Sequence, residues 1–250
     1  MKTVVIIPCR MASERLPKKF MQDINGKTLI RRVYENVSRV FGHSDLFIAC
    51  DGEPLYSHTK EFGANAVITD PDLPSGTDRI AAALKEIDPN GDKYDIVINF
   101  QGDDVNVDPT ICARLVDLMR QTKCDIATVA QPIDDAGLIN NPNIVKIAMG
   151  ENGRCVYFSR SPIPFARAVG GVDNALWHIG IYVYNAASLR KFVSLPVGKL
   201  EATEKLEQLR ALENGMSIYA LTVKDTRMDP RAPADVNTAE DLEEMRRFVK

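Results

Sequence analysis

Short runs of β-branched residues alternate with amphipathic stretches throughout the first half of the chain. The runs predict buried strands at 4–7, 46–49, 66–68 and 95–100. Between these runs, apolar residues recur at intervals of three and four, which predicts helices at about 28–41, 53–62 and 77–87. Strand–helix–strand repetition forms right-handed crossover units around a mainly parallel sheet. We therefore expect an α/β fold.

The second half of the chain carries more strand signals than helix signals. After a helix at about 109–121, the pattern predicts strands near 125–131, 144–149, 155–158, 178–184 and 217–223, and helices at about 201–214 and 238–249. Turn signals such as the Gly-Glu-Asn-Gly run at 150–153 are typical of hairpins rather than crossovers. We expect a mixed sheet with an antiparallel portion in the second half, within one compact domain that contains an inserted subdomain.

Size, charge and cysteine usage exclude several classes of protein. A chain of 250 residues buries a proper core, and 31 basic against 34 acidic residues give no global field suited to a nucleic acid partner. The apolar run at 4–7 ends at Pro8, and no run of 18 apolar residues exists, so we expect neither a signal segment nor membrane insertion. The five cysteines are odd in number, widely spaced and without a CxxC pair. We expect reduced, mostly buried thiols in a cytoplasmic protein.

The loop after the first predicted strand concentrates positive charge. Residues 8–19 read P-C-R-M-A-S-E-R-L-P-K-K, with four cations within ten residues. Ligands of open α/β sheets bind at the carboxyl ends of the strands, so these cations are placed to hold phosphate groups. The loop lacks the GxxxxGK[ST] pattern and is therefore not a Walker P-loop. A solvated surface loop is the alternative that charge alone leaves open.

This loop resembles the signature loop of the CMP-KDO synthetases, which are 3-deoxy-manno-octulosonate (KDO) cytidylyltransferases. That family usually has Ala at the place of Cys9 and Gly at the place of Lys18, and residues 24–30 resemble it as well. The resemblance continues through several motifs to Leu242. It implies a three-layer nucleotide-diphospho-sugar-transferase-like fold with a mixed, mainly parallel sheet and an inserted antiparallel dimerisation subdomain. It also implies a nucleotide-binding part at about 1–125 and a sugar-binding and dimerisation part at about 126–235.

The resemblance assigns the nucleotide site to three segments. The loop cations and Ser13 would bind the triphosphate of CTP, and the S-G-T-D-R run at 75–79 would lie beside the cytosine, although Ser75 or Thr77 equally suits an ordinary helix N-cap. In the run at 98–104, I-N-F-Q-G-D-D, Gln101 would lie near the base and Asp103 on a magnesium ion, whereas a solvated acidic turn is the alternative. The implied nucleotide-binding residues are Arg10, Ser13, Arg15, Lys19, Ser75, Gly76, Thr77, Arg79 and Gln101, with Arg10, Lys19 and Asp103 as catalytic residues.

Three residues of the second half are implied as sugar ligands. The F-S-R-x-x-I-P string at 158–164 offers Arg160 as the anchor of the sugar carboxylate, although an isolated arginine there could simply cap a carbonyl. The H-x-G-I-Y run offers His178 as a ligand of a sugar hydroxyl, against the commoner structural histidine. The helix at about 201–214 offers Gln208.

The sequence departs from the family at the second magnesium ligand. The family's G-V-D-T-x-E-D-L reads D-V-N-T-A-E-D-L at 235–242, so Asn237 falls where a carboxylate is expected. An amide oxygen still ligates magnesium but brings no charge. Asp235, two residues earlier, would face the same side of an extended segment. Three possibilities stay open: Asp103 and the nucleotide hold the metal, Asp235 takes over, or activity is impaired.

The resemblance implies an enzyme that transfers CMP from CTP to KDO, giving CMP-KDO and pyrophosphate for lipopolysaccharide biosynthesis, with Mg2+ and as a homodimer. The alternatives are transfer to another acidic sugar, such as an amino-substituted KDO or a nonulosonic acid, and a non-catalytic nucleotide-binding homologue, which Asn237 keeps open.

Overall fold

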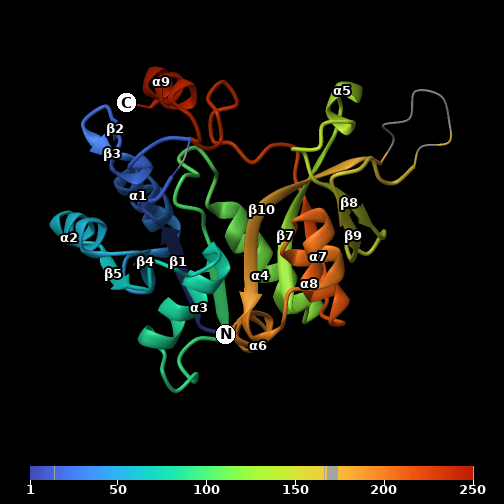
Figure 1. Cartoon of the computed structure of the whole chain (residues 1–250), viewed down its shortest axis with the longest axis horizontal. Helices are drawn as coiled ribbons and strands as arrows, with labels where there is room; N and C mark the ends of the chain where they lie inside the picture. Colours follow the sequence, from blue (N-terminus) through green and yellow to red (C-terminus); the bar gives the residue numbers. More distant parts are fainter. Residues whose placement is uncertain (14, 166, 168–173, 250) are drawn as a thin grey trace. The chain divides into compact units, whose positions relative to one another are not determined.

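The computed structural model describes residues 1–13, 15–165, 167 and 174–249, and it divides into two compact units (Figure 1). Unit 1 comprises Met1–Ile111 and Thr226–Lys250, and unit 2 comprises Cys112–Asp225. The helix α4 (Thr110–Thr122) carries the chain from one unit into the other. The single domain expected from the sequence remains a prediction.

Unit 1 is built on a parallel sheet with the strand order β6-β1-β4-β5. Its strands are β1 (Thr3–Cys9), β4 (Leu46–Cys50), β5 (Asn65–Ile68) and β6 (Ile96–Asn99). Its helices are α1 (Leu29–Phe41), α2 (Glu53–Glu61), α3 (Gly76–Ile87) and α9 (Ala239–Phe248). Residues 4–7 are at most 1% exposed. Both faces of β1 are therefore covered, which explains its continuous apolar run.

The loops of unit 1 that matter for function leave the sheet at one edge. Cys9 pairs with Cys50 at the ends of β1 and β4, and Ile6 pairs with Asn99 at the end of β6. After β1, the chain forms the 3-10 turn η1 (Lys19–Met21) and a small hairpin of β2 (Asp23–Ile24) and β3 (Lys27–Thr28). The segment before α9 returns to this edge, because the Val236 N–H donates to the Asp103 carbonyl at 3.2 Å.

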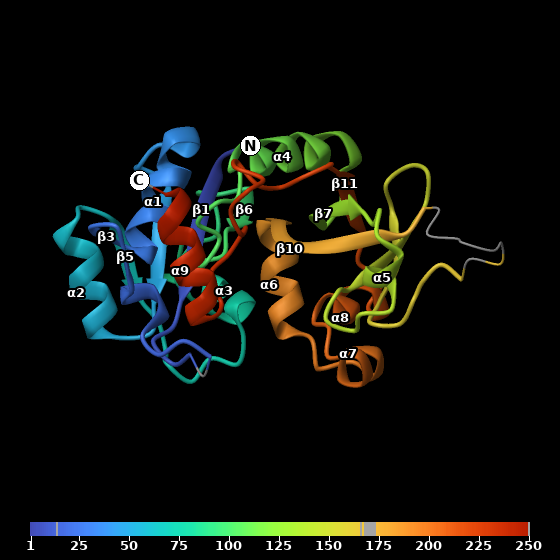
Figure 2. The same ribbon diagram turned by 90° about the horizontal axis from the view of Figure 1, so that it is seen from above.

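Unit 2 contains most of the antiparallel pairing between the described strands. Its strands are β7 (Ile126–Pro132), β8 (Lys146–Met149), β9 (Cys155–Ser159), β10 (Leu176–Asn185) and β11 (Ile218–Thr222). β10, the long orange strand in Figure 2, runs antiparallel to β7 and β8, β8 runs antiparallel to β9, and β11 runs parallel to β7. Its helices are α5 (Ala136–Ile139), α6 (Ala186–Ser194), α7 (Lys199–Glu204) and α8 (Gln208–Glu213).

Most of the predicted elements are confirmed, and so is the mixed, mainly parallel α/β fold. The turn at 150–153 does join a hairpin: Gly153 has a positive φ of 82°, and the Gly150 N–H donates to the Arg154 carbonyl at 2.9 Å. The helix predicted at about 201–214 is wrong, because Lys205 adopts a left-handed conformation with φ 55° and separates α7 from α8. Helix α6, capped by the Asn185 side chain, was not predicted.

The remaining expectations from composition concern cysteines and membranes. All five cysteines are free and buried, as predicted. Across the described residues, no helix combines the length and the apolar character needed to cross a bilayer.

Candidate active site

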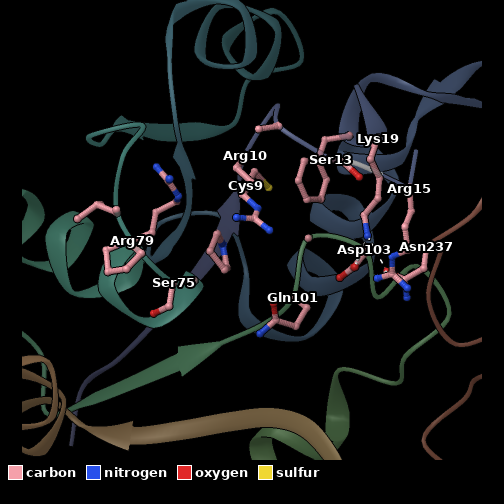
Figure 3. A pocket seen from close by; sticks show the side chains of 17 residues that line it. Cys9, Arg10, Ser13, Arg15, Lys19, Ser75, Arg79, Gln101, Asp103 and Asn237 are labelled. Atoms are coloured by element: carbon pink, nitrogen blue, oxygen red, sulfur yellow. Dashed lines mark hydrogen bonds and ion pairs between the residues drawn. The ribbon is translucent and has the colours of Figure 1, made fainter. Parts of the chain in front are cut away.

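A pocket of about 780 Å³ lies in unit 1 at the carboxyl ends of β1 and β6 (Figure 3). Its walls come from the loop after β1, the start of α3, the residues after β6 and the segment before α9. The predicted residues that line it are Arg10, Ser13, Arg15, Lys19, Ser75, Gly76, Arg79, Gln101, Asp103 and Asn237. Thr77, which is 1% exposed, and Asp235, which accepts a hydrogen bond from Asn237, are not among the lining residues.

Lys19 is a buried cation of the pocket, with an exposure of 7%. Its ammonium donates to the Asp103 carboxylate and, at 3.0 Å, to Asn237 Oδ1. Arg15, which is exposed, donates to the same Oδ1 at 2.9 Å. The turn that directs Lys19 inward begins at Lys18, which has a positive φ of 51°. Glycine adopts such a conformation more easily than lysine.

The oxygen atoms around the Lys19 ammonium are suitably placed for a magnesium ion. One ammonium already contacts both Asp103 and Asn237, so the two side-chain oxygens lie within reach of a single cation. Asp235 accepts a hydrogen bond from the Asn237 amide nitrogen, which turns the amide oxygen towards Lys19. Within the described residues, no group of three or more His, Cys, Asp or Glu side chains is arranged around a common metal position. The donor set fits a Mg2+ whose other ligands are phosphate oxygens and water.

The carboxyls around Lys19 influence one another. Burial raises the pKa of Asp235, and the nearby Asp103 charge raises it further. Burial also raises the pKa of Asp104 well above its ordinary value, with the same sign of effect from Asp103 and Asp235. These shifts follow from crowding negative charges in a place with little water, so the cluster favours any added positive charge.

Two predicted residues at the start of α3, Ser75 and Arg79, are hydrogen-bonded within the protein rather than projecting freely. Ser75 Oγ accepts from the Asp78 N–H at 3.1 Å and donates to Asp78 Oδ2 at 2.6 Å, which is the N-cap alternative for this hydroxyl. Arg79 is 2% exposed and donates to Thr69 Oγ1 at 2.6 Å and to the Asp70 carbonyl at 3.1 Å. The hydroxyl and the guanidinium that the sequence singled out are thus engaged within the protein.

Gly102 allows β6 to approach the end of β1. A Cβ at this position would lie 2.7 Å from Cys9 Sγ, 2.8 Å from the Phe20 ring and 3.1 Å from the Pro8 carbonyl. The neighbouring Gln101 lines the pocket, and its amide nitrogen donates to Asn99 Oδ1 at 3.1 Å. The absence of a side chain, rather than backbone flexibility, is therefore what this glycine contributes.

Asp51 is a residue of this region that the sequence analysis missed. It follows β4, and its Oδ2 accepts from the Met11 N–H of the loop after β1 at 2.6 Å. Its other carboxylate oxygen is buried and has no hydrogen-bond partner among the described residues. The signal was present, because an acid directly after a parallel strand lies at the same edge of the sheet as the loop after β1.

In unit 2, the guanidinium of Arg160 binds backbone carbonyls. It donates to Glu204 O at 2.8 Å and to Pro142 O at 2.9 Å. Lys146, which is fully buried, donates to the Arg160 carbonyl at 2.5 Å and to Ile144 O at 2.6 Å. The carbonyl-capping alternative therefore describes these contacts, and the sugar carboxylate as a partner of Arg160 remains a prediction.

His178 lies on β10 with an exposure of 8%, packed edge-on against Phe158 with ring centroids 5.0 Å apart. Its Nε2 is 3.1 Å from Thr128 Oγ1, which itself lies 2.8 Å from the Ile181 carbonyl. A carbonyl only accepts, so the single Thr128 hydroxyl proton goes to Ile181 and the ring donates from Nε2. Burial lowers the pKa of His178 to about 3, which keeps the ring neutral with Nδ1 as an acceptor.

Gln208 opens α8 with an exposure of 4%, and its amide nitrogen is buried without a hydrogen-bond partner in the described structure. An unpaired buried donor costs about 1–3 kcal/mol. A ligand oxygen beside this amide would supply the missing acceptor.

Comparison with known proteins identifies the family. A model of the cytidylyltransferase family matches residues 4–218. The chain belongs to the cytidylyltransferase family. A 3-deoxy-manno-octulosonate cytidylyltransferase from Chloroherpeton thalassium is 41% identical, over 100% of this chain and 98% of the relative. An 8-amino-3,8-dideoxy-manno-octulosonate cytidylyltransferase from Shewanella putrefaciens is 38% identical, over 96% of this chain and 98% of the relative. The predicted nucleotidyltransferase activity and the predicted family are therefore confirmed.

Solved structures agree with this membership. A CMP:2-keto-3-deoxy-manno-octonic acid synthetase complexed with CTP superposes with a TM-score of 0.89 at 34% identity, covering 99% of this chain and 98% of that one. The 4-diphosphocytidyl-2C-methyl-D-erythritol synthase of Anaerococcus prevotii, 11% identical with a TM-score of 0.64, shares the fold. A cytidylyltransferase must hold a triphosphate while its α-phosphate is attacked, and the cations of the pocket are placed to stabilise the charge on such a group.

Proposed function

We propose that this cytidylyltransferase transfers CMP from CTP to 3-deoxy-D-manno-octulosonate, giving CMP-KDO and pyrophosphate for lipopolysaccharide biosynthesis. The observation that carries the proposal is the pocket at the end of β1, where Lys19 joins Asp103 to Asn237 with Arg10 and Arg15 on its walls. The relatives named for this reaction match the chain over nearly its full length. The two facts together favour CTP as the nucleotide and KDO as the acceptor.

In the proposed reaction, the anomeric hydroxyl of the sugar attacks the α-phosphate of CTP in line, and pyrophosphate leaves. Arg10, Arg15 and Lys19 bind the phosphate oxygens and stabilise the charge that develops on them. Asp51 holds the backbone of their loop through the Met11 N–H, which keeps these side chains in position. Positioning and charge stabilisation account for most of the catalysis in reactions of this type, so a covalent intermediate is not needed.

Magnesium belongs to the proposal. Asp103 and Asn237 would hold the ion, with Asp235 orienting the amide through its hydrogen bond. When bound, the ion neutralises phosphate charge and lowers the pKa of a coordinated hydroxyl. Lys19 contacts the same two side chains in the described structure, so its ammonium would turn towards the triphosphate when both ligands are present.

Unit 2 supplies the proposed sugar ligands. The neutral His178 ring would accept a sugar hydroxyl at Nδ1, and the unpaired amide of Gln208 would donate to a sugar oxygen. Arg160 has guanidinium N–H groups beyond those that donate to Glu204 O and Pro142 O, and these would bind the sugar carboxylate.

We also propose a cytoplasmic homodimer formed through unit 2, where exposed apolar side chains include Val156, Phe165 and Val197. Sedimentation equilibrium of a Val156→Asp variant tests the dimer, which it should dissociate.

A panel of sugar acids, each assayed with CTP and with UTP for pyrophosphate release, tests the function. We expect turnover with CTP and KDO. An 8-amino-substituted KDO is the second candidate, because relatives named for that substrate are 38% identical to this chain. Exclusive use of the amino sugar or of a nonulosonic acid would replace the KDO assignment. Tight CTP binding without turnover of any sugar acid would indicate a non-catalytic homologue.

A further inference from the structure

Arg79 lines the pocket, but its guanidinium serves the segment after β5. Its NH1 donates to Thr69 Oγ1 at 2.6 Å and to Asp70 O at 3.1 Å, and its NH2 donates to Pro71 O at 3.3 Å. Figure 3 shows the nitrogens of Arg79 pointing away from Gln101. With an exposure of 2%, this side chain is part of the protein interior rather than of a surface loop.

The contact with Thr69 ties Arg79 to the sheet. The Thr69 hydroxyl donates to the Cys50 carbonyl at 2.9 Å, and its N–H donates to the same oxygen at 2.8 Å. The Thr69 oxygen is therefore free to accept from Arg79. Hydrogen bonds thus run from α3 through Arg79 and Thr69 to the end of β4, which makes the start of the following segment rigid.

The segment that Arg79 holds continues directly into the pocket wall. Residues 70–72 are exposed, and the two that follow, Leu73 and Pro74, line the pocket just before Ser75 caps α3. Apart from the Arg79 bonds, a turn holds the segment, in which Asp70 Oδ1 accepts from the Asp72 N–H at 2.9 Å and the Asp70 carbonyl accepts from the Leu73 N–H at 3.5 Å. A segment with so few internal bonds depends on external ones for its position.

The chemistry of this wall differs from that of the rest of the pocket. The Lys19 side carries the cations and carboxylates that suit phosphates and a metal ion. Leu73, Pro74 and Gly76 present apolar surface and backbone groups, which suit the face and edge of a base. The position of this wall would therefore decide how well a base fits.

We propose that Arg79 is a positioning residue that fixes the 70–74 wall against the base and thereby sets the preference for CTP. The proposal rests on the proposed function and adds a route by which a residue without direct contact to the base controls specificity. It requires the forked guanidinium and not merely a positive charge, because three acceptors on three successive residues must be held at once.

Calorimetric titration of the protein with CTP and with UTP tests the role of Arg79. Because this measurement needs no sugar acid, its result does not depend on which sugar acid is the acceptor. We expect Arg79→Met to weaken CTP binding about tenfold and UTP binding much less. Arg79→Lys should behave similarly, because one ammonium does not replace the fork. Thr69→Val, which removes the first acceptor and leaves the charge in place, should also reduce the discrimination.

Arg32→Met is the matched control. Arg32 also holds a loop of unit 1, donating to Ile24 O at 2.6 Å and to Asn25 O at 2.9 Å, but it does not line the pocket. Its loss should lower the melting temperature without changing the CTP to UTP ratio. The proposal is overturned if Arg79→Lys keeps the wild-type ratio, which would make charge the cause, or if Arg79→Met and Thr69→Val weaken both nucleotides equally.

Discussion

Replacing His178 with glutamine should flatten the pH dependence of this protein's stability on the acid side of neutrality. The ring is buried on β10, donates from Nε2 to Thr128, and is neutral because burial lowers its pKa to about 3 from an ordinary 6.5. Glutamine places an amide N–H near the same position and does not titrate. The substitution therefore keeps the donor to Thr128 and removes the proton equilibrium.

The magnitude follows from the two pKa values. A base with a depressed folded pKa binds more protons when unfolded, so its contribution is fully present above about pH 6.5 and is lost as the pH falls towards 3. At about pH 5, the unfolded ring is charged and the folded ring is neutral. That pH lies about 1.5 below the unfolded value, and each whole step is worth about 1.4 kcal/mol, so the wild type should lose about 2 kcal/mol relative to neutral pH.

Urea unfolding at about pH 7.5 and about pH 5 measures this loss. Trp177, the chain's only tryptophan, lies beside His178 in sequence and reports by fluorescence on unit 2. The wild type should lose about 2 kcal/mol more than His178→Gln on acidification. His43→Gln is the control, because it removes a histidine from the exposed surface of unit 1 and shows how that alone changes the loss of stability on acidification. Equal losses in the wild type and in His178→Gln would refute the buried neutral ring.

Three further substitutions test the site and the fold. Asn237→Asp should strengthen Mn2+ binding about tenfold, as measured by calorimetry in the presence of CTP. Without metal, the same variant should have a lower unfolding midpoint, because the new carboxylate faces Asp235. Unchanged metal affinity would show that residue 237 is not a metal ligand. Gly102→Ala should cost about 1–3 kcal/mol in urea unfolding, because its Cβ would meet Cys9 Sγ at 2.7 Å; a neutral result would show that β1 and β6 separate easily. Glu201→Ala removes the carboxylate that Arg210 binds at 2.6 Å in a buried pair and should cost about 3–5 kcal/mol. Glu243→Ala, at an exposed pair, should cost less than about 1 kcal/mol, and similar costs for the two variants would contradict this.

The sequence predicted the elements whose burial leaves a periodic pattern. β1, β4 and β6 read as continuous apolar runs because helices cover parallel strands, and α1 and α3 read as amphipathic for the same reason. The break at Lys205 could not be read this way. The apolar spacing of α7 and α8 continues across it, and a left-handed lysine has no signature comparable to a glycine.

The positions of the pocket residues were also predictable, but their hydrogen bonds were not. The strand-end rule brings the loop that carries Arg10 and Lys19 together with the segment that carries Gln101 and Asp103, and these two segments lie far apart in the sequence. The partners of Arg79 and Arg160 are mostly backbone carbonyls, which every residue offers. The sequence therefore does not reveal these hydrogen-bond partners. Only the structure distinguishes a guanidinium that binds the protein's own backbone from one that is available to a ligand.

The change at position 237 makes physical sense as a matter of charge balance. Lys19 and Arg15 meet Asp103, Asp235 and the Asn237 amide in one cluster, and burial already raises the pKa of Asp235. A carboxylate at 237 would add a negative charge beside Asp235 and lose the donor that now satisfies it. The amide instead gives its N–H to Asp235 and its oxygen to the two cations. If this balance is what retains Asn237, then exchanging the two residues, Asp235→Asn with Asn237→Asp, should keep the metal-free stability that Asn237→Asp alone loses. A double variant as unstable as the single one would show that the amide is needed at 237 itself.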